Sequence, residues 1–309
     1  MQYPVMRWLS PFLFLLVVAC ASKTPSPHEA AGGTPPGETA THEAAVAAPP
    51  GESHAPRRRV AAPQTGSCQQ NAISQLERLD PDGYSIYQQI DDKQFFRSWI
   101  TCDDLQLDLA TAVHESTHHL TSQHDAFPLV NGGQISLPHE VSKFYAPSLI
   151  AAKFTSGNFV NTYLTPGESS SATNFLYLLD ELNAYSHDLN AAVDLESLRP
   201  HNDVRVDHRD GLAALMAFVA VYVETARESE PVTWSGLQKQ AAANAVATLW
   251  RQAEHVMVSS CRIPNIGTED KTYIRRFCEA GPRSAMQTIL GRPPICPVDC
   301  LRAPRTAFR

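Results

Sequence analysis

The sequence predicts a mainly α-helical domain, of α+β type with one small sheet or hairpin, behind an N-terminal region that does not fold. Two observations support this fold class. Long segments between residues 68 and 260 place apolar side chains three and four positions apart, as one face of an amphipathic helix requires. A single segment, 127–137, has strand-like apolar residues on both sides of Asn131-Gly132-Gly133, a pattern typical of a β-hairpin.

The expected elements follow in chain order. A helix over 68–79 is followed by a turn at 81–84, because Pro-Asp-Gly is a turn-forming sequence. The remaining long helices are expected over 103–122, 170–194, 210–229 and 233–260, with mixed structure over 144–170 and short helices after residue 260. The apolar run of 210–229 is only about 13 residues long, too short to cross a bilayer, which indicates a buried helix.

The N-terminus has the layout of a secretory signal. One positive charge, Arg7, precedes an apolar run from Trp8 to Ala19. The run ends in the sequence VVAC at Cys20, which resembles the bacterial lipobox. The resemblance implies that residues 1–19 are a lipoprotein signal peptide and that lipidated Cys20 anchors the exported chain to a membrane of the cell envelope, on its periplasmic or cell-surface side. The alternative is an ordinary cleaved signal with an incidental cysteine.

Residues 20–66 are rich in Pro, Ala and Gly and have few large apolar side chains. Such a segment cannot bury enough apolar surface to offset the entropy of ordering it, so a disordered tether is expected. Residues 67–309 then form one folded domain. The formal charge of −7 comes from 25 basic and 32 acidic residues, without a basic face. This balance argues against nucleic acid as a partner.

The cysteine count fits an exported, oxidised domain. Besides Cys20, the chain has an even number of cysteines: Cys68, Cys102, Cys261, Cys278, Cys296 and Cys300. Three disulfides are therefore expected. Proximity along the chain favours the local pairs Cys261–Cys278 and Cys296–Cys300, which would staple the C-terminal part of the domain as a cap.

The candidate metal ligands and the candidate base lie close together in one short segment. In TAVHESTHHLTSQ, His114 and His118 lie one helical turn apart, so both imidazoles leave the same helix face at the spacing that a single Zn²⁺ needs. Glu115 projects about 100° around the helix, where it can reach water at the metal without being a ligand. With 12 His in 309 residues, chance predicts only about 0.02 matches to this pattern. His119 is expected to face away from the pair.

A catalytic zinc site needs a third protein ligand. Glu181, in the middle of the helix expected over 170–194, is the favoured candidate, and small Ala184 would let this helix approach closely. Asp188, on the same face, could accept the second imidazole N–H of a ligand histidine. The alternative third ligands are Asp180, His187, Glu140, His139 and Glu168.

His114-Glu115-x-x-His118 followed by a helical Glu181-x-x-Ala184 resembles the gluzincin branch of zinc metallopeptidases. The resemblance covers only these two helical segments, and Tyr185 stands where such families usually have Asp. It implies a zincin-like domain whose zinc is held by His114, His118 and Glu181, with Glu115 as the general base.

The expected function is a membrane-anchored, extracytoplasmic zinc endopeptidase that acts on a peptide or protein substrate. Candidates for stabilising the developing oxyanion are Tyr185, Tyr163, Tyr145 and His187. No G-x-S-x-G motif suggests a serine hydrolase. Two alternatives remain open: a zinc-binding envelope lipoprotein without turnover, which serves as a binding or assembly module, and an envelope interaction protein without metal.

Overall fold

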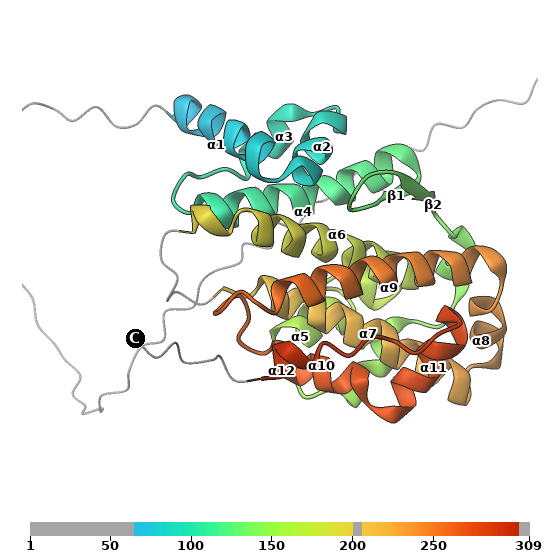
Figure 1. Cartoon of the computed structure of the whole chain (residues 1–309). Coiled ribbons are helices and arrows are strands. Elements are labelled where there is room, and N and C mark those ends of the chain that lie inside the picture. The colour runs from blue at the N-terminus through green and yellow to red at the C-terminus, as the bar shows by residue number, and fades with distance from the viewer. Residues whose placement is uncertain (1–64, 200–205, 303–309) are drawn as a thin grey trace, which may run out of the picture. The chain divides into compact units, whose positions relative to one another are not determined.

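The computed structural model describes residues 65–199 and 206–302. The expected signal peptide, Cys20 and nearly all of the expected tether lie outside these residues. The described part is mainly helical and contains one two-stranded sheet, as the sequence predicts (Figure 1). None of the helices in residues 65–199 and 206–302 is long and apolar enough to cross a membrane.

Three helices begin the domain: α1 (Thr65–Leu79), α2 (Pro81–Gln89) and α3 (Lys93–Ser98). The turn predicted at 81–84 is wrong, because α2 starts there. Asp80 caps this helix by accepting a hydrogen bond from the Gly83 backbone N–H at 2.9 Å, and Pro81 occupies the first helical position. A capping aspartate and a proline at this position favour a helix start over a simple turn.

Helices α4 (Leu105–His124) and α6 (Phe175–Asp194) are antiparallel neighbours in the middle of the domain (Figure 1). The Gln106 side chain donates a hydrogen bond to the Ala192 carbonyl at 2.6 Å, which places the start of α4 beside the end of α6. Strands β1 (Ala126–Pro128) and β2 (Gln134–Ser136) follow α4 and pair antiparallel, with Phe127 opposite Ile135. The expected hairpin is thus confirmed.

The chain between β2 and α6 forms short helices, in agreement with the mixed pattern there. They are η1 (His139–Lys143), η2 (Pro147–Lys153), α5 (Asn158–Leu164) and η3 (Ser170–Ala172), and η4 (Glu196–Leu198) follows α6.

Helix α7 (His208–Ser229) is buried over residues 208–226, as expected for the apolar segment. The segment 233–260, expected as one helix, is split into α8 (Pro231–Leu237) and α9 (Gln240–Ser260) because Lys239 has an extended backbone. The domain ends with α10 (Asp270–Cys278), α11 (Ala280–Leu290) and α12 (Val298–Leu301).

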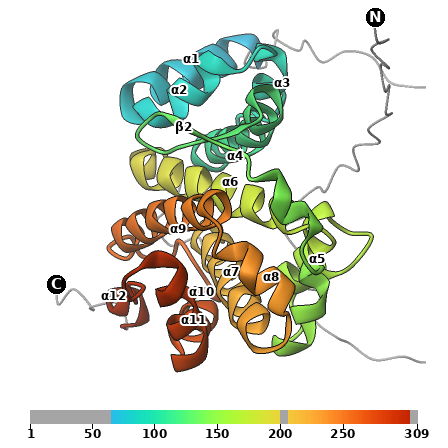
Figure 2. The same cartoon turned by 90° about the vertical axis from the view of Figure 1, so that its right-hand side faces the viewer.

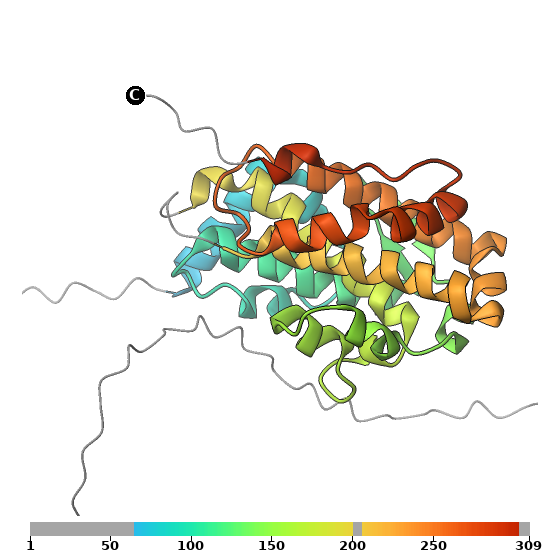
Figure 3. The same ribbon diagram turned by 90° about the horizontal axis from the view of Figure 1, so that it is seen from below.

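The helices form successive layers. Helices α1–α3 cover α4, which packs on α6, and the other side of α6 contacts α7 and α9 (Figure 2). Helices α10 and α11 pack against α7 on its far side, as the view from below shows (Figure 3). The pair α4–α6 is therefore enclosed by packed helices on both sides, which gives the side chains between them a rigid frame.

Three disulfides are present, as the even cysteine count predicts: Cys68–Cys102, Cys261–Cys300 and Cys278–Cys296. The expected local pairs Cys261–Cys278 and Cys296–Cys300 are wrong. Helix α12 folds back to contact the ends of both α9 and α10, so Cys300 meets Cys261 although 39 residues separate them. The packing of the helices that carry the cysteines, rather than proximity along the chain, therefore sets the pairing.

Candidate functional site

The motif histidines lie on a well-capped helix. Asp104 accepts a hydrogen bond from the Leu107 backbone N–H at 3.1 Å and so caps the N-terminus of α4. His114 and His118 leave the same face of this helix, and their rings meet edge to face with centroids 5.0 Å apart. The antiparallel packing of α6 brings Glu181 opposite both rings.

Three ligand atoms converge between α4 and α6. The Oε2 atom of Glu181 lies 3.5 Å from Nε2 of His118 and 3.9 Å from Nε2 of His114. One potential ligand atom from each of the three residues lies within 4.8 Å of the other two, and no further such group occurs within residues 65–199 and 206–302. The structure thus brings together the three residues that the sequence predicts as metal ligands.

This arrangement fits a metal ion. Two atoms bound at about 2.1 Å to a tetrahedral Zn²⁺ lie roughly 3.4 Å apart, close to the two measured separations. In addition, Oε2 of Glu181 is buried and has no hydrogen-bond partner. A buried carboxylate oxygen without a partner is costly, and coordination by a cation would satisfy it.

Asp180, the residue before Glu181, contacts the His118 ring on the side opposite Glu181. Its Oδ2 atom lies 2.6 Å from Nδ1 of His118, so this nitrogen donates the hydrogen bond and Nε2 is directed toward Glu181. From the sequence, Asp180 is expected only as an alternative third ligand. In the structure it is the carboxylate that orients His118, the role expected for Asp188.

The two imidazoles have opposite electrostatic surroundings. Burial and, to a smaller extent, the neighbouring His118 lower the pKa of His114 to about 3, against the opposing effect of Glu181. For His118, burial also favours the neutral ring, but the carboxylates of Asp180 and Glu181 outweigh it and raise the pKa well above its usual value. His114 is therefore a neutral imidazole with a free electron pair, as metal binding requires.

Glu115 is half-buried beside this cluster. Burial raises the pKa of its carboxyl group, while His118 lowers it and Glu181 raises it. These influences show that the Glu115 carboxyl group lies close enough to His118 and Glu181 to interact with both electrostatically.

Two tyrosines from different helices join at the site. The ring of Tyr185, on α6, meets the His114 ring edge to face with centroids 4.6 Å apart. Its hydroxyl lies 2.7 Å from that of Tyr163, on α5. Burial raises the pKa of both phenols well above the usual value, so both stay protonated and able to donate hydrogen bonds.

The other candidates lie elsewhere. His187 donates from Nε2 to the Pro128 carbonyl at 3.0 Å and faces the hairpin; burial lowers its pKa to about 4. Tyr145 donates to the Tyr222 carbonyl at 2.6 Å. His139 pairs with Asp125 at the surface, at 2.9 Å. None of these, nor Glu140 or Glu168, belongs to the cluster of ligand atoms in the described residues.

His119 lies off the face of α4 that carries His114 and His118, as predicted. Its ring stacks on Phe95 of α3, with centroids 5.4 Å apart and an angle of 27° between the rings. It therefore helps to hold α3 against α4 and is a natural control position for experiments on the neighbouring His118.

Asp188 was expected to support a ligand histidine, but its Oδ1 accepts a hydrogen bond from Nδ1 of His208 at 2.8 Å. Both side chains are buried, and Nε2 of His208 has no hydrogen-bond partner. Sequence reasoning does not single out His208, because it begins a separate helix and belongs to no motif. Its only signal is a histidine at the start of an otherwise apolar helix.

Comparisons with protein-family models, curated proteins and solved structures find no match for this chain.

Proposed function

We propose that this protein is a zinc-dependent endopeptidase whose metal is held by His114, His118 and Glu181. The observation that carries the proposal is the convergence of Nε2 of both histidines on the buried Oε2 of Glu181, an acceptor that has no hydrogen bond. Two imidazoles and one carboxylate, three protein ligands in all, are the donor set of a catalytic rather than a structural zinc site.

The surroundings of the donor set support the same proposal. Asp180 holds His118 by its Nδ1, which leaves Nε2 for the metal. His114 is kept neutral by burial. A structural zinc site would have no use for a carboxylate at position 115, whereas a hydrolase needs a base at this position.

Bound Zn²⁺ would supply a Lewis acid that acidifies water and polarises the carbonyl of the substrate. In the proposed reaction, the Glu115 carboxylate takes a proton from the attacking water and later passes it to the leaving amine. The peptide C–N bond breaks, and the products are a carboxylate and an amine. The paired hydroxyls of Tyr163 and Tyr185 are the proposed donors to the oxyanion, since both remain protonated beside His114.

The proposal includes the location of the enzyme. Cys20, at the end of the apolar N-terminal run, is the proposed lipidation site, and the chain would act on proteins or peptides outside the cytoplasm while anchored to a membrane. The three disulfides agree with an oxidising compartment. Cys20→Ser should release the protein from the membrane fraction or block its maturation. Unchanged fractionation with a normally processed N-terminus would refute this part.

The decisive experiment measures zinc content and cleavage of a generic peptide library by the purified full-length chain and five variants. His114→Ala, His118→Ala and Glu181→Ala should lose zinc and activity together, since each removes a metal ligand. Glu115→Gln should keep zinc and lose turnover. His119→Ala, the matched control, should keep both because its ring packs on Phe95.

The alternatives give different patterns. A zinc-binding module without turnover would bind zinc but cleave no peptide in the wild type. A protein without metal would contain no zinc in any variant. If Glu181→Ala retains full zinc, the gluzincin ligand set is wrong, and loss of zinc from His119→Ala but not from His118→Ala would overturn the assignment of the histidines.

A further inference from the structure

Tyr185 lies where four helices meet. It belongs to α6, its ring edge contacts His114 on α4, and its hydroxyl pairs with Tyr163 on α5. The fourth contact is with α7, where the ring lies directly over Gly211. The position of this one ring therefore affects both a candidate metal ligand and a candidate oxyanion donor.

Gly211 is a buried glycine in the first turn of α7, and the close approach of the Tyr185 ring explains its presence. A Cβ atom at position 211 would lie 2.0 Å from Cε1 and 2.3 Å from Cδ1 of Tyr185. Gly211 is not among the glycines with a positive φ, so its backbone conformation does not require glycine. Glycine weakens a helix relative to alanine, and the lack of a side chain here serves the approach of another group.

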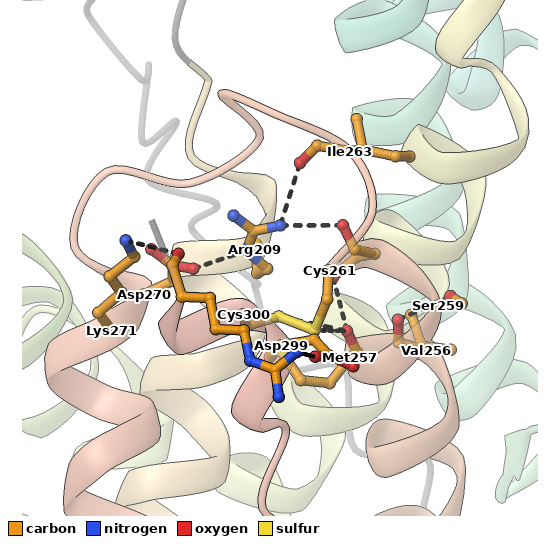
Figure 4. The surroundings of a disulfide bond; sticks show 12 residues. Arg209, Val256, Met257, Ser259, Cys261, Ile263, Asp270, Lys271, Asp299 and Cys300 are labelled. Carbon is orange, nitrogen blue, oxygen red and sulfur yellow. Dashed lines mark hydrogen bonds and ion pairs between the residues drawn. A yellow bond between two sulfur atoms is a disulfide. The ribbon is translucent and has the colours of Figure 1, made fainter. Parts of the chain in front are cut away.

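The residues just before Gly211 are tied to the segment after α9, and Figure 4 shows the contacts of Arg209 there. The guanidinium of Arg209 donates to Asp270 at 2.6 Å and to the Ser260 carbonyl at 2.9 Å, next to the Cys261–Cys300 disulfide. Asp210 accepts hydrogen bonds from three successive backbone N–H groups, those of residues 268–270.

His208 completes the attachment of this turn, through its hydrogen bond to Asp188 on α6. Residues 208 and 211 thus face α6, and residues 209 and 210 bind the segment 260–270. Because the backbone of this turn is attached both to α6 and to the segment 260–270, a side chain added at 211 has to displace the Tyr185 ring rather than the helix.

We propose that Gly211 is a positioning residue of the candidate site. Its missing side chain leaves the space in which the Tyr185 ring lies, and that ring orients the His114 imidazole and the Tyr163 hydroxyl. The expected effect of Gly211 on zinc affinity rests on the proposed function, whereas its effect on the orientation of the His114 ring does not.

The test compares Gly211→Ala with Gly236→Ala in the full-length chain. Gly236 is the matched control, a helical glycine whose Cβ would lie 2.5 Å from the Phe144 ring, outside the ligand cluster. NMR of the chain with labelled histidine reports the resonance of the His114 ring, assigned from His114→Ala. Competition with a chelator reports the dissociation constant for zinc, and thermal unfolding reports stability.

Gly211→Ala should shift the His114 resonance and raise the dissociation constant for zinc about tenfold or more, the usual size of such indirect effects. Gly236→Ala should lower the unfolding temperature but change neither of these readouts. An unshifted His114 resonance in a folded Gly211→Ala protein would overturn the proposal.

A second variant pair keeps the test decisive if Gly211→Ala folds poorly. In a Tyr185→Ala background the methyl group at 211 meets no ring, so Gly211→Ala should cost no further stability and cause no further shift of His114. Additive effects of the two substitutions would contradict the proposal. A wild-type chain that binds no zinc would refute the proposed function. The shift of the His114 resonance and the double-mutant comparison would still test the role of Gly211 in that case.

Discussion

Two adjacent carboxylates of α6 contact opposite sides of one imidazole: Oδ2 of Asp180 lies 2.6 Å from Nδ1 of His118, and Oε2 of Glu181 lies 3.5 Å from Nε2. Successive helical residues diverge by about 100°, which lets neighbouring side chains reach around both edges of a ring placed between them. The direction of the His118 ring is set by this pair.

Asp180→Asn should therefore weaken zinc binding without abolishing it. The amide cannot accept the Nδ1–H bond as strongly as a carboxylate, and loss of such support typically costs about 10- to 100-fold in metal affinity. The measurement is the dissociation constant for zinc. Asp125→Asn is the control, since Asp125 pairs with the exposed His139. Equal affinities of the two variants would contradict the role of Asp180.

Tyr163→Phe should lower kcat for peptide cleavage by about 100- to 1,000-fold, the range found when one donor to an oxyanion is removed. Its zinc content should stay unchanged, because Tyr163 is not among the candidate ligands. Tyr145→Phe removes a phenol that donates to the Tyr222 carbonyl, and its kcat should stay near the wild-type value. A wild-type kcat in Tyr163→Phe would remove this tyrosine from the proposed mechanism.

Asp80 should make the stability depend on pH. This carboxyl group is fully buried, and burial raises its pKa from 3.8 to about 7, with smaller contributions from Asp194 and Asp82. The folded state therefore keeps a proton that the unfolded state loses above about pH 4. The contribution of Asp80 is fully present below pH 4 and decreases as the pH rises to about 7, by on the order of 4 kcal/mol.

Asp80→Asn, which cannot ionise, isolates this contribution. The difference in unfolding free energy between the variant and the wild type, measured by urea denaturation from pH 4 to pH 8, should shift in favour of the variant as the pH rises. The asparagine oxygen can still cap α2 through the Gly83 N–H. Parallel stability curves for the two proteins would show that Asp80 does not titrate in this range.

Arg209→Met should lower the free energy of unfolding by about 3 to 5 kcal/mol, because it leaves Asp270 as an unpaired buried charge. The control is Lys153→Met, which removes a more exposed ion pair with Glu228 and should cost less than about 1 kcal/mol. Chemical denaturation measures both. A small effect of Arg209→Met would mean that the segment 260–270 does not depend on this ion pair.

The disulfide pairing can be tested directly. Mass spectrometry of a non-reduced digest should find Cys261 linked to Cys300 and Cys278 linked to Cys296. Replacing Cys261 and Cys300 together by alanine should cost about 2 to 4 kcal/mol of stability, since the bridge closes a long loop. Peptides that link Cys261 to Cys278 would contradict the structure.

The sequence by itself determined the features that depend on local geometry. The periodicity of apolar side chains placed the main helices, and Asn131-Gly132-Gly133 placed the hairpin. The i, i+4 spacing of His114 and His118 put both rings on one helix face, because that relation is a property of any α-helix. Glu181 was predictable as the third ligand because it lies in the middle of a strong helix whose small Ala184 allows a close approach.

Only the tertiary structure decided which groups meet across helices. The register of α4 against α6 brings Asp180 into contact with His118, whereas Asp188 contacts His208. This is so although Asp188, and not Asp180, lies on the same face of α6 as Glu181. The return of α12 to the end of α9 set the pairing of Cys261. The need for glycine at 211 arises only where the ring of Tyr185 approaches α7. Such contacts depend on how whole helix faces pack, and a shift of one residue along a helix turns a side chain by about 100°, so sequence spacing alone does not specify them.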